Sequence, residues 1–423
     1  MKRIAMLCDG TWSDVRSGPA TNVGRLAWLV GGAGPDGTPQ KVFYLSGVGT
    51  GRGLTGVAKA VDRLVGGAVG WGLDENILDA YRHIAKAFEP GDELYVFGFS
   101  RGAYTARSLV GLIRSAGIAP PEHLDRLDEA MERYRRRDDP TTKPSNEASY
   151  PFRAEFSPMT ATSADELAWR KRHGKGSARA IHLRIAYVGI WDTVGALGVP
   201  GYWTTAPVLN RRYQFHDTDL SSMVRSARHA VALDERRRTF VPTLWSNTDK
   251  LNREALGLPL NADLTGTCRE TLAYRQEWYP GDHGGVGGGE RVGLSAYARG
   301  WVAEGAQKAG LAFKPGALDA IRAERDVMEP LLAPVPRLSA TALMRANAAD
   351  REGPENPLDL APAVFDRLRA DPGYRPGSLD RVWGVIKARA RTGEICGACS
   401  DARTCEENRA RPFDWLTPAA PQA

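Results

Sequence analysis

The chain has 423 residues, of which 42% are hydrophobic and 25% are charged, and its formal net charge is +6. This length can bury one large α/β domain with insertions or two domains, and the composition is that of an ordinary globular protein. The small basic excess is scattered among acids and forms no basic patch with interleaved aromatic residues, so nucleic acid is not an expected partner.

Export signals and membrane spans are not evident in the sequence. Asp9 interrupts the first apolar run too early for a cleavable signal peptide. The most apolar later stretch, residues 53–73, carries Lys59, Asp62 and Arg63, which a simple membrane span would not tolerate. Five cysteines are too few for a secreted disulfide scaffold. We expect cytoplasmic synthesis, and export without a cleavable signal stays open.

Strand-like runs recur along the chain with helical patterns between several of them. The runs are residues 3–7, 42–45, 93–97, 183–190 and 272–278. This alternation predicts an α/β fold with a mostly parallel sheet and covering helices. Residues 118–180 are polar and rich in proline and charge, which indicates an insertion over the sheet edge or the active site. We expect a catalytic domain over residues 1–313 and a C-terminal helical extension over residues 314–423.

Two early loops resemble nucleotide or phosphate motifs but fail their spacing. The first strand leads into Asp9-Gly10-Thr11, yet a phosphatase with an aspartyl nucleophile usually has a second aspartate where Thr11 stands. The loop of residues 46–53 lacks the dinucleotide pattern, because Arg52 and Leu54 occupy positions that need glycine. We therefore expect no nucleotide cofactor.

The stretch GFSRG places Ser100 between Gly98 and Gly102. The β-prone run before it and the helical spacing after it, which ends at Gly117, are typical of a serine nucleophile on a strained strand-to-helix turn. A glycine-rich turn with an incidental serine is the alternative. The flanking elements favour the nucleophile.

A serine nucleophile needs a base and an acid that orients the base. Asp192 directly follows a β-rich run, although a capping or turn aspartate would also fit there. His283, in EWYPGDHGGVGGGE, follows another β-rich run and is the preferred base. His216, with Asp217 beside it, is the competing candidate.

The other histidines are less suitable as a base. We expect His83 and His229 to lie in helical patterns as packing residues. His123 and His173 fall in the charged insertion, and His182 starts a strand.

Several stretches together carry a family resemblance across roughly residues 1–310. They are CDGTW, YLSGVGTG, ELYVFGFSRGAYTARSLVGLI, VGIWDTVGALG, ALDERRRTFVPTLW and EWYPGDHGGVGGGE. In this order they resemble the α/β-hydrolase family that includes lipase effectors of type VI secretion systems. The resemblance implies an α/β-hydrolase-like fold and an ester hydrolase with Ser100, Asp192 and His283 as its catalytic triad. In the secreted members of this family the substrate is a phospholipid.

The expected mechanism needs no cofactor. Ser100 attacks an ester carbonyl, and backbone N–H groups of Arg101 and of the Gly10-Thr11 turn hold the oxyanion. We expect a lipid ester or a small soluble ester as substrate, and peripheral membrane contact is compatible with the former. The competing hypothesis is a non-catalytic member that binds a protein partner, of unknown identity, through its C-terminal third.

Two further features have open roles. Cys396, Cys399 and Cys405 suggest a zinc or iron–sulfur site, but free or redox-paired thiols on a tail are the preferred interpretation, since the fourth ligand would have to come from Cys268 or a histidine. The insertion is where a lid would lie, yet it is strongly polar. Residues 64–73 are the better candidate for an apolar wall, with helix core as the default interpretation.

Overall fold

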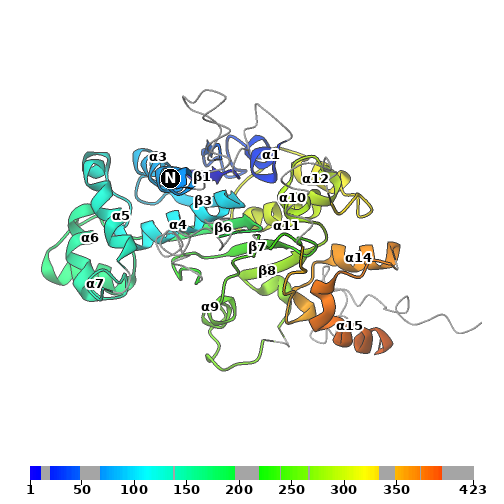
Figure 1. The fold of residues 1–423 in the computed structure, drawn as a ribbon. Coiled ribbons are helices and arrows are strands. Elements are labelled where there is room, and N and C mark those ends of the chain that lie inside the picture. Colours follow the sequence, from blue (N-terminus) through cyan, green and yellow to red (C-terminus); the bar gives the residue numbers. More distant parts are fainter. Residues whose placement is uncertain are drawn as a thin grey trace, which may run out of the picture.

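The computed structural model describes residues 1–10, 20–47, 67–136, 139–195, 219–238, 240–264, 267–332, 348–371 and 373–392. At its centre lies a six-stranded sheet in the order β2-β1-β3-β6-β7-β8, in which every neighbouring pair is parallel (Figure 1). The strands are β1 (Arg3–Cys8), β2 (Gln40–Leu45), β3 (Glu93–Phe99), β6 (Ile185–Trp191), β7 (Ala227–Ala232) and β8 (Tyr274–Tyr279). The predicted α/β class is confirmed.

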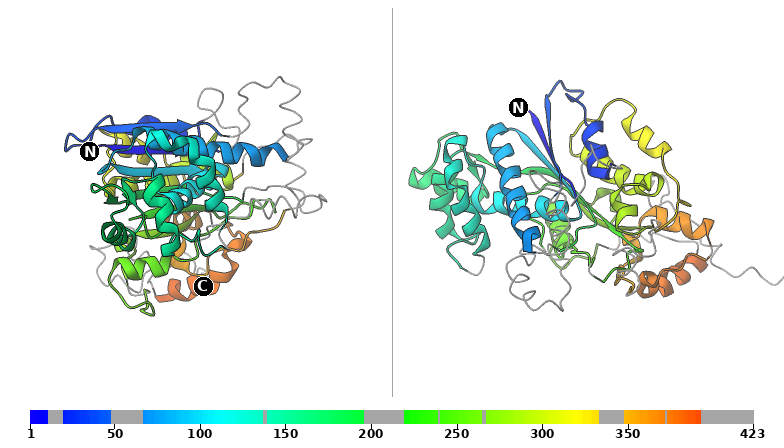
Figure 2. Two further views of the ribbon diagram at one scale, coloured as in Figure 1. Left: turned by 90° about the vertical axis from the view of Figure 1, so that its left-hand side faces the viewer. Right: turned by 45° about the horizontal axis from the view of Figure 1, so that its top comes forward.

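Helices cover both faces of this sheet. Side chains of a strand alternate between its faces, so Ile4 and Met6 pack with one helical layer and Ala5 and Leu7 with the other. The first layer contains α3 (Gly67–Ala87) and α4 (Arg101–Ala116), and the second contains α1 (Asn22–Leu29), α11 (Val292–Lys308) and α12 (Ala317–Ala323). Figure 2 shows the sheet between the two layers.

The strand order changes direction between β1 and β3. From β1 the chain first adds β2 on one side and then continues on the other side with β3 and the later strands. In open α/β sheets, ligands bind outside the carboxyl ends of the strands at such a switch point. Ser100 follows β3 at this place.

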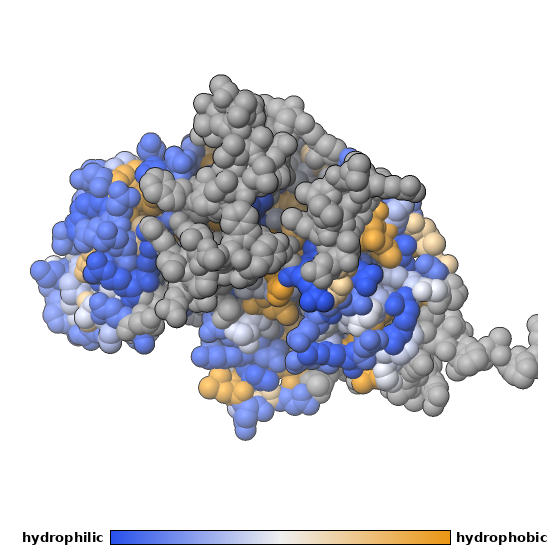
Figure 3. All heavy atoms as spheres, in the orientation of Figure 1, coloured by the Kyte–Doolittle hydropathy of each residue, from blue (hydrophilic) through white to orange (hydrophobic). Residues whose placement is uncertain are grey.

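The insertion forms a small helical unit beside α3 and α4 (Figure 1). Its elements are η1 (Pro121–Arg126), α5 (Leu127–Arg135), η2 (Glu147–Ser149), α6 (Tyr150–Phe156), α7 (Ala164–His173) and the strand pair β4 (Thr160–Ala161) and β5 (Ile181–His182). A buried ion cluster joins α6 to α7: Glu166 binds Arg153 at 2.8 Å and Arg170 at 2.5 Å. The outward surface of this unit is largely hydrophilic (Figure 3).

The insertion is attached far from Ser100. It follows the C-terminal end of α4, whose first residue, Arg101, is the neighbour of Ser100. A helix of this length, 16 residues, rises about 24 Å. The described part of the insertion therefore packs on the helical layer and does not lie over the carboxyl end of β3, where a lid would be needed.

The C-terminal extension packs against strands β7 and β8, at one edge of the sheet. Besides α12, which belongs to the second helical layer, its described elements are η4 (Pro357–Asp359), α14 (Pro362–Ala370), η5 (Gly377–Leu379) and α15 (Asp380–Thr392). Val364 and Phe365 share a buried cluster with Val231 and Trp278. The Ala361 N–H also donates to the Trp278 carbonyl at 2.9 Å, so the chain covers the free edge of β8.

One expectation of the sequence was wrong. The stretch around His229 was expected to be helical, but residues 227–232 form strand β7. Every residue of this strand is buried. A short apolar run buried on both faces lacks a distinct strand period, so a pattern cannot separate it from a buried helix.

The remaining helices complete the described structure. They are α9 (Thr248–Ala255), η3 (Arg269–Thr271) and α10 (His283–Gly287). Within the described ranges, no helix combines the length and the apolar character needed to cross a membrane.

Candidate active site

Ser100 occupies the turn between β3 and α4. Its φ of 57° and ψ of −123° are a conformation that residues other than glycine rarely adopt. A Cβ on Gly98 would lie 2.4 Å from the Gly102 carbonyl oxygen, and a Cβ on Gly102 would lie 2.2 Å from the Cys8 carbonyl oxygen. The turn therefore requires glycine at both positions. The GFSRG spacing reflects a tight strand–turn–helix geometry with serine at its apex.

This packing gives a direct test of the turn. Gly102→Ala is expected to destabilise the protein by about 1–3 kcal/mol or more, because the new methyl group meets backbone atoms of β1 that cannot move alone. Denaturant unfolding measures the change. Gly32→Ala is the matched control, since a Cβ at Gly32 would have no atom within 4 Å. Equal stability of the two variants would contradict the tight turn.

The structure brings Ser100, His283 and Asp192 together at the carboxyl ends of three strands. The Ser100 Oγ lies 2.8 Å from His283 Nε2, and His283 Nδ1 lies 2.5 Å from Asp192 Oδ2. Because a carboxylate only accepts hydrogen bonds, Nδ1 carries the proton. Nε2 then accepts from the Ser100 hydroxyl. This is the arrangement in which a histidine can remove the serine proton.

Aromatic rings hold the His283 imidazole on two sides. The Phe99 ring lies 4.6 Å from it, centroid to centroid, and the Phe240 ring meets it edge-on at 4.9 Å. Ser100 and His283 are buried, each with 7% of its surface exposed. The rings restrict the imidazole to the plane that joins serine to aspartate.

Asp192 is completely buried and begins the loop after β6. Its φ of 36° turns the chain sharply. The Ala232 N–H donates to its Oδ1 at 2.8 Å, and Arg351 donates to both of its oxygens. Burial by itself would raise the pKa of Asp192, but the Arg351 charge and the hydrogen bond from His283 hold it well below its usual range. The carboxylate is therefore ionised.

The loop after β7 supports the backbone around His283. The His283 N–H donates to Glu235 Oε2 at 3.2 Å, and the Gly281 N–H donates to Asp234 Oδ2 at 2.6 Å. The Tyr374 hydroxyl, from the C-terminal extension, donates to the same Asp234 oxygen at 2.9 Å. Burial raises the pKa of Asp234 to about 6. These bonds fix where the histidine enters the site.

A family comparison decides how this chain is classified. The model of the type VI secretion system phospholipase effectors of Tle1-like type, catalytic domain, matches residues 2–305. The chain belongs to this family. The match includes Ser100, Asp192 and His283 and ends before Arg351. The resemblance drawn from the sequence motifs is confirmed.

One curated relative of this Tle1-like chain aligns with only part of it. The uncharacterized protein YEL023C of Saccharomyces cerevisiae is 30% identical over 250 residues, which are 56% of this chain and 32% of the yeast protein. The chain thus aligns with about a third of the yeast protein.

Two solved structures are also similar. An uncharacterized protein from Pseudomonas aeruginosa has 17% identity and a TM-score of 0.39, with 99% of this chain and 60% of that chain covered. A Tle1 effector bound to the VgrG spike of the type 6 secretion system has 16% identity and a TM-score of 0.33, with 68% and 51% covered. The chain spans little more than half of either structure.

The expected oxyanion donors of the Tle1-like domain differ in position. Arg101 is the first residue of α4, so its N–H belongs to the positive end of that helix, next to Ser100. The Gly10 N–H donates instead to Asp9 Oδ1 at 2.6 Å. It would have to turn away from Asp9 to bind a substrate oxygen. Thr11 lies outside the described residues.

The other histidines do not join the Ser100 chain of hydrogen bonds in the described structure. His229 accepts the Thr193 N–H at its Nε2 (3.3 Å), and its Nδ1 lies 2.9 Å from Gln276 Oε1. Burial lowers the pKa of His229 to about 3, so this ring is neutral and supports the loop that begins at Asp192. His216, the competing base, lies outside the described residues.

Sequence reasoning missed the residues that surround Ser100, His283 and Asp192. Glu235 and Phe240 lie in ALDERRRTFVPTLW, a stretch that carried the family resemblance but had no assigned role. Arg351 and Tyr374 lie in the extension, where isolated polar residues show no period or motif. Their contacts with Asp192 and Asp234 cross more than a hundred residues of chain.

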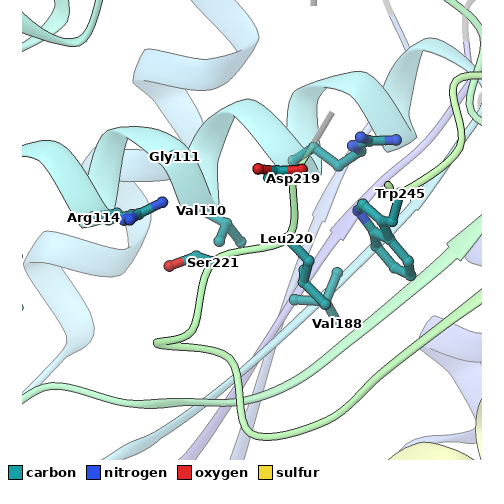
Figure 4. Close-up of a pocket in the computed structure, with 9 residues that line it drawn as sticks. Val110, Gly111, Arg114, Val188, Asp219, Leu220, Ser221 and Trp245 are labelled. Atoms are coloured by element: carbon teal, nitrogen blue, oxygen red, sulfur yellow. The ribbon is translucent and has the colours of Figure 1, made fainter. Parts of the chain in front are cut away.

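Two cavities that the described residues line contain none of Ser100, His283 and Asp192. A pocket between α4 and the segment before β7 has Val110, Leu220 and Trp245 in its wall (Figure 4). Its volume is about 20 Å³, which is room for one water molecule. A groove of about 610 Å³ lies near the amino ends of β6 and β8 and is lined in part by His182 and Arg184.

The three cysteines that were weak candidates for a metal site cannot be placed in this structure. Cys396, Cys399 and Cys405 lie outside the described residues. Cys268 is half-buried with a free thiol. Among the residues that the structure describes, no group of three metal-ligating side chains comes together.

Proposed function

We propose that this Tle1-like protein is a serine ester hydrolase in which Ser100, His283 and Asp192 form the catalytic triad. The observation that carries the proposal is the continuous hydrogen-bond chain from Ser100 Oγ through the imidazole to Asp192. Its members come from three separate strand ends, so a packing role alone would not require this alignment. A strained serine at the apex of the turn supports the same assignment.

The chemistry follows from the positions of these atoms. His283 Nε2 takes the Ser100 proton as Oγ attacks the ester carbonyl, and Asp192 stabilises the imidazolium that forms. The Arg101 N–H, at the helix N-terminus, stabilises the developing oxyanion together with a second donor. His283 then protonates the leaving alcohol. Water attacks the acyl-enzyme by the same route, and no cofactor enters any step.

We propose lipid esters as the substrate class. Membership in a phospholipase effector family supports this choice. An exposed apolar side chain close to His283 is compatible with it as well, since Val241 is 66% exposed and follows Phe240, whose ring contacts His283. The polar insertion, which packs away from Ser100, no longer argues for a soluble substrate.

A comparison of dissolved with aggregated substrate tests whether the protein acts on lipid esters. We expect hydrolysis rates to rise when the substrate concentration passes the point at which it aggregates, and we expect fatty acid release from phospholipid vesicles. Short-chain soluble esters provide the comparison. Fast turnover of soluble esters without fatty acid release from vesicles would contradict a phospholipase and leave a carboxylesterase.

The relatives suggest a delivery route for this chain. The Tle1 effector among the similar structures is bound to a VgrG spike. We propose that this chain acts as an exported effector with a spike protein as its partner. Co-purification of the full chain with a VgrG protein of the producing organism tests this. Its absence from the culture medium of a secretion-competent producer would contradict export.

A further inference from the structure

Arg351 is a buried cation that lies outside the matched catalytic domain. Only 8% of its surface is exposed, and the family match ends at residue 305. It stands in the segment before η4, in a polar stretch of the extension. Arg351 lies 159 residues after Asp192 in the chain, and its guanidinium group forms a hydrogen bond with the Asp192 carboxylate.

Each of the two terminal nitrogens of Arg351 donates two hydrogen bonds. Nη1 donates to Asp192 Oδ1 at 2.7 Å and to the Ala232 carbonyl at 2.8 Å. Nη2 donates to Asp192 Oδ2 at 3.0 Å and to the Phe240 carbonyl at 2.5 Å. The guanidinium plane is therefore fixed by three parts of the site. Lysine could not reproduce this fork, because its single nitrogen has no planar pair of donors.

These contacts saturate the Asp192 carboxylate. Oδ1 accepts from Ala232 and Arg351, and Oδ2 accepts from His283 and Arg351. A carboxylate offers about four acceptor directions, and all of them are occupied here. The Asp192 carboxylate therefore cannot rotate without breaking one of these hydrogen bonds. The oxygen that meets His283 Nδ1 is held in one place. The imidazole orientation depends on that place.

The charge of Arg351 also permits Asp192 to be ionised where it lies. Asp192 has no exposed surface, and a buried carboxylate without compensation is strongly disfavoured. His283 is neutral before the reaction in the proposed mechanism, so it cannot supply the balancing charge. Arg351 supplies it within 2.7 Å.

The segment that carries Arg351 is tied to the loop after β7. The Ala349 N–H donates to the Arg236 carbonyl at 2.9 Å, and Asp350 forms an ion pair with Arg236 at 2.9 Å. Arg237 and Ala348 form an isolated antiparallel bridge. This loop also contains Glu235 and Phe240, which contact His283.

From these observations we infer that Arg351 is a positioning residue for Asp192, and that the segment around it completes the active site. The inference rests on the proposed hydrolase function. It assigns a role to the chain beyond the matched catalytic domain: the extension holds the acid of the triad in the orientation that aligns the base.

A double-mutant cycle tests whether Arg351 acts through Asp192. We expect Arg351→Gln to lower kcat roughly 10²-fold with little change in KM, after correction for the fraction of active sites, because a displaced imidazole misaligns the reacting atoms. Arg351→Lys should recover part of the loss. In an Asp192→Asn background, Arg351→Gln should cause no further loss. Additive losses would overturn the inference.

Control variants separate positioning from folding. Glu352→Ala removes the neighbouring carboxylate, which is highly exposed and pairs with Arg381 on α15, and should keep the wild-type kcat. If Arg351→Gln alone does not fold, two other variants still test the inference. They are Arg351→Lys and the double variant Arg351→Gln/Asp192→Asn, in which both charges of the pair are removed. A double variant with a kcat well below that of Asp192→Asn alone would show that Arg351 does not act through the carboxylate.

A spectroscopic readout works without any turnover. The proton between His283 Nδ1 and Asp192 should give a far-downfield ¹H NMR signal that disappears in His283→Ala. We expect this signal to shift or broaden in Arg351→Lys and to stay unchanged in Glu352→Ala. An unchanged signal in Arg351→Lys would overturn the inference. If the wild type hydrolyses no ester but the NMR signal changes as expected, the proposed hydrolase function is rejected and the positioning of Asp192 by Arg351 still holds.

Discussion

Ser100→Ala is expected to reduce ester hydrolysis by at least about 10⁴-fold, to the background rate. The hydroxyl is the proposed nucleophile, and loss of a triad nucleophile leaves only the residual effect of binding and oxyanion stabilisation. Alanine removes one atom from a turn whose glycines remain, so we expect the fold to persist. Hydrolysis of a chromogenic ester and labelling by a fluorophosphonate probe measure the effect.

A second serine on the same helix provides the control. Ser108 is also buried, two turns further along α4, and belongs to no hydrogen bond of the triad. Ser108→Ala should keep both activity and labelling. If Ser100→Ala were still labelled, the nucleophile would be another residue. If the wild type were neither labelled nor active, the non-catalytic, partner-binding alternative would be favoured.

His283→Ala is expected to cost about as much activity as Ser100→Ala. The members of a triad act as a unit, so removing the base leaves an unactivated serine. His216→Ala, the variant of the competing histidine, should lose much less. Measurement of kcat/KM for both variants ranks them. The reverse order would show that His216 is the base.

Folding must be checked separately for His283→Ala. The imidazole fills the space between Phe99 and Phe240, so its removal leaves a cavity and lowers stability. Circular dichroism and thermal unfolding would detect this loss. A folded variant without activity supports a chemical role, whereas an unfolded one would require His283→Gln, which fills more of the space.

Much of the site follows from strand ends. Ser100, Asp192 and His283 each come shortly after a β-prone run, and parallel strands bring their carboxyl ends to one edge of the sheet. The glycines that flank Ser100 indicated a turn without room for a Cβ. These signals are local, so the sequence alone could predict them.

The rest depended on contacts between distant segments. Strand β7 is buried on both sides, and its short apolar run with Arg228 and His229 fits a helix as well as a strand. Arg351 belongs to no periodic pattern, and its role exists only because the extension folds back to Asp192. The placement of the insertion follows from the direction of α4, which carries the chain away from Ser100.

The position of Arg351 after all strands of the sheet also has a consequence for protein synthesis. The ribosome delivers the strands of the sheet and all three triad residues well before residue 351 emerges. Until then a nascent domain that closes around Asp192 would bury a carboxylate without its balancing cation, at a cost of several kcal/mol. Domains of this size tend to fold as units during translation. Assembly of the site around Asp192 therefore has to wait until residue 351 has been synthesised, after every strand of the sheet.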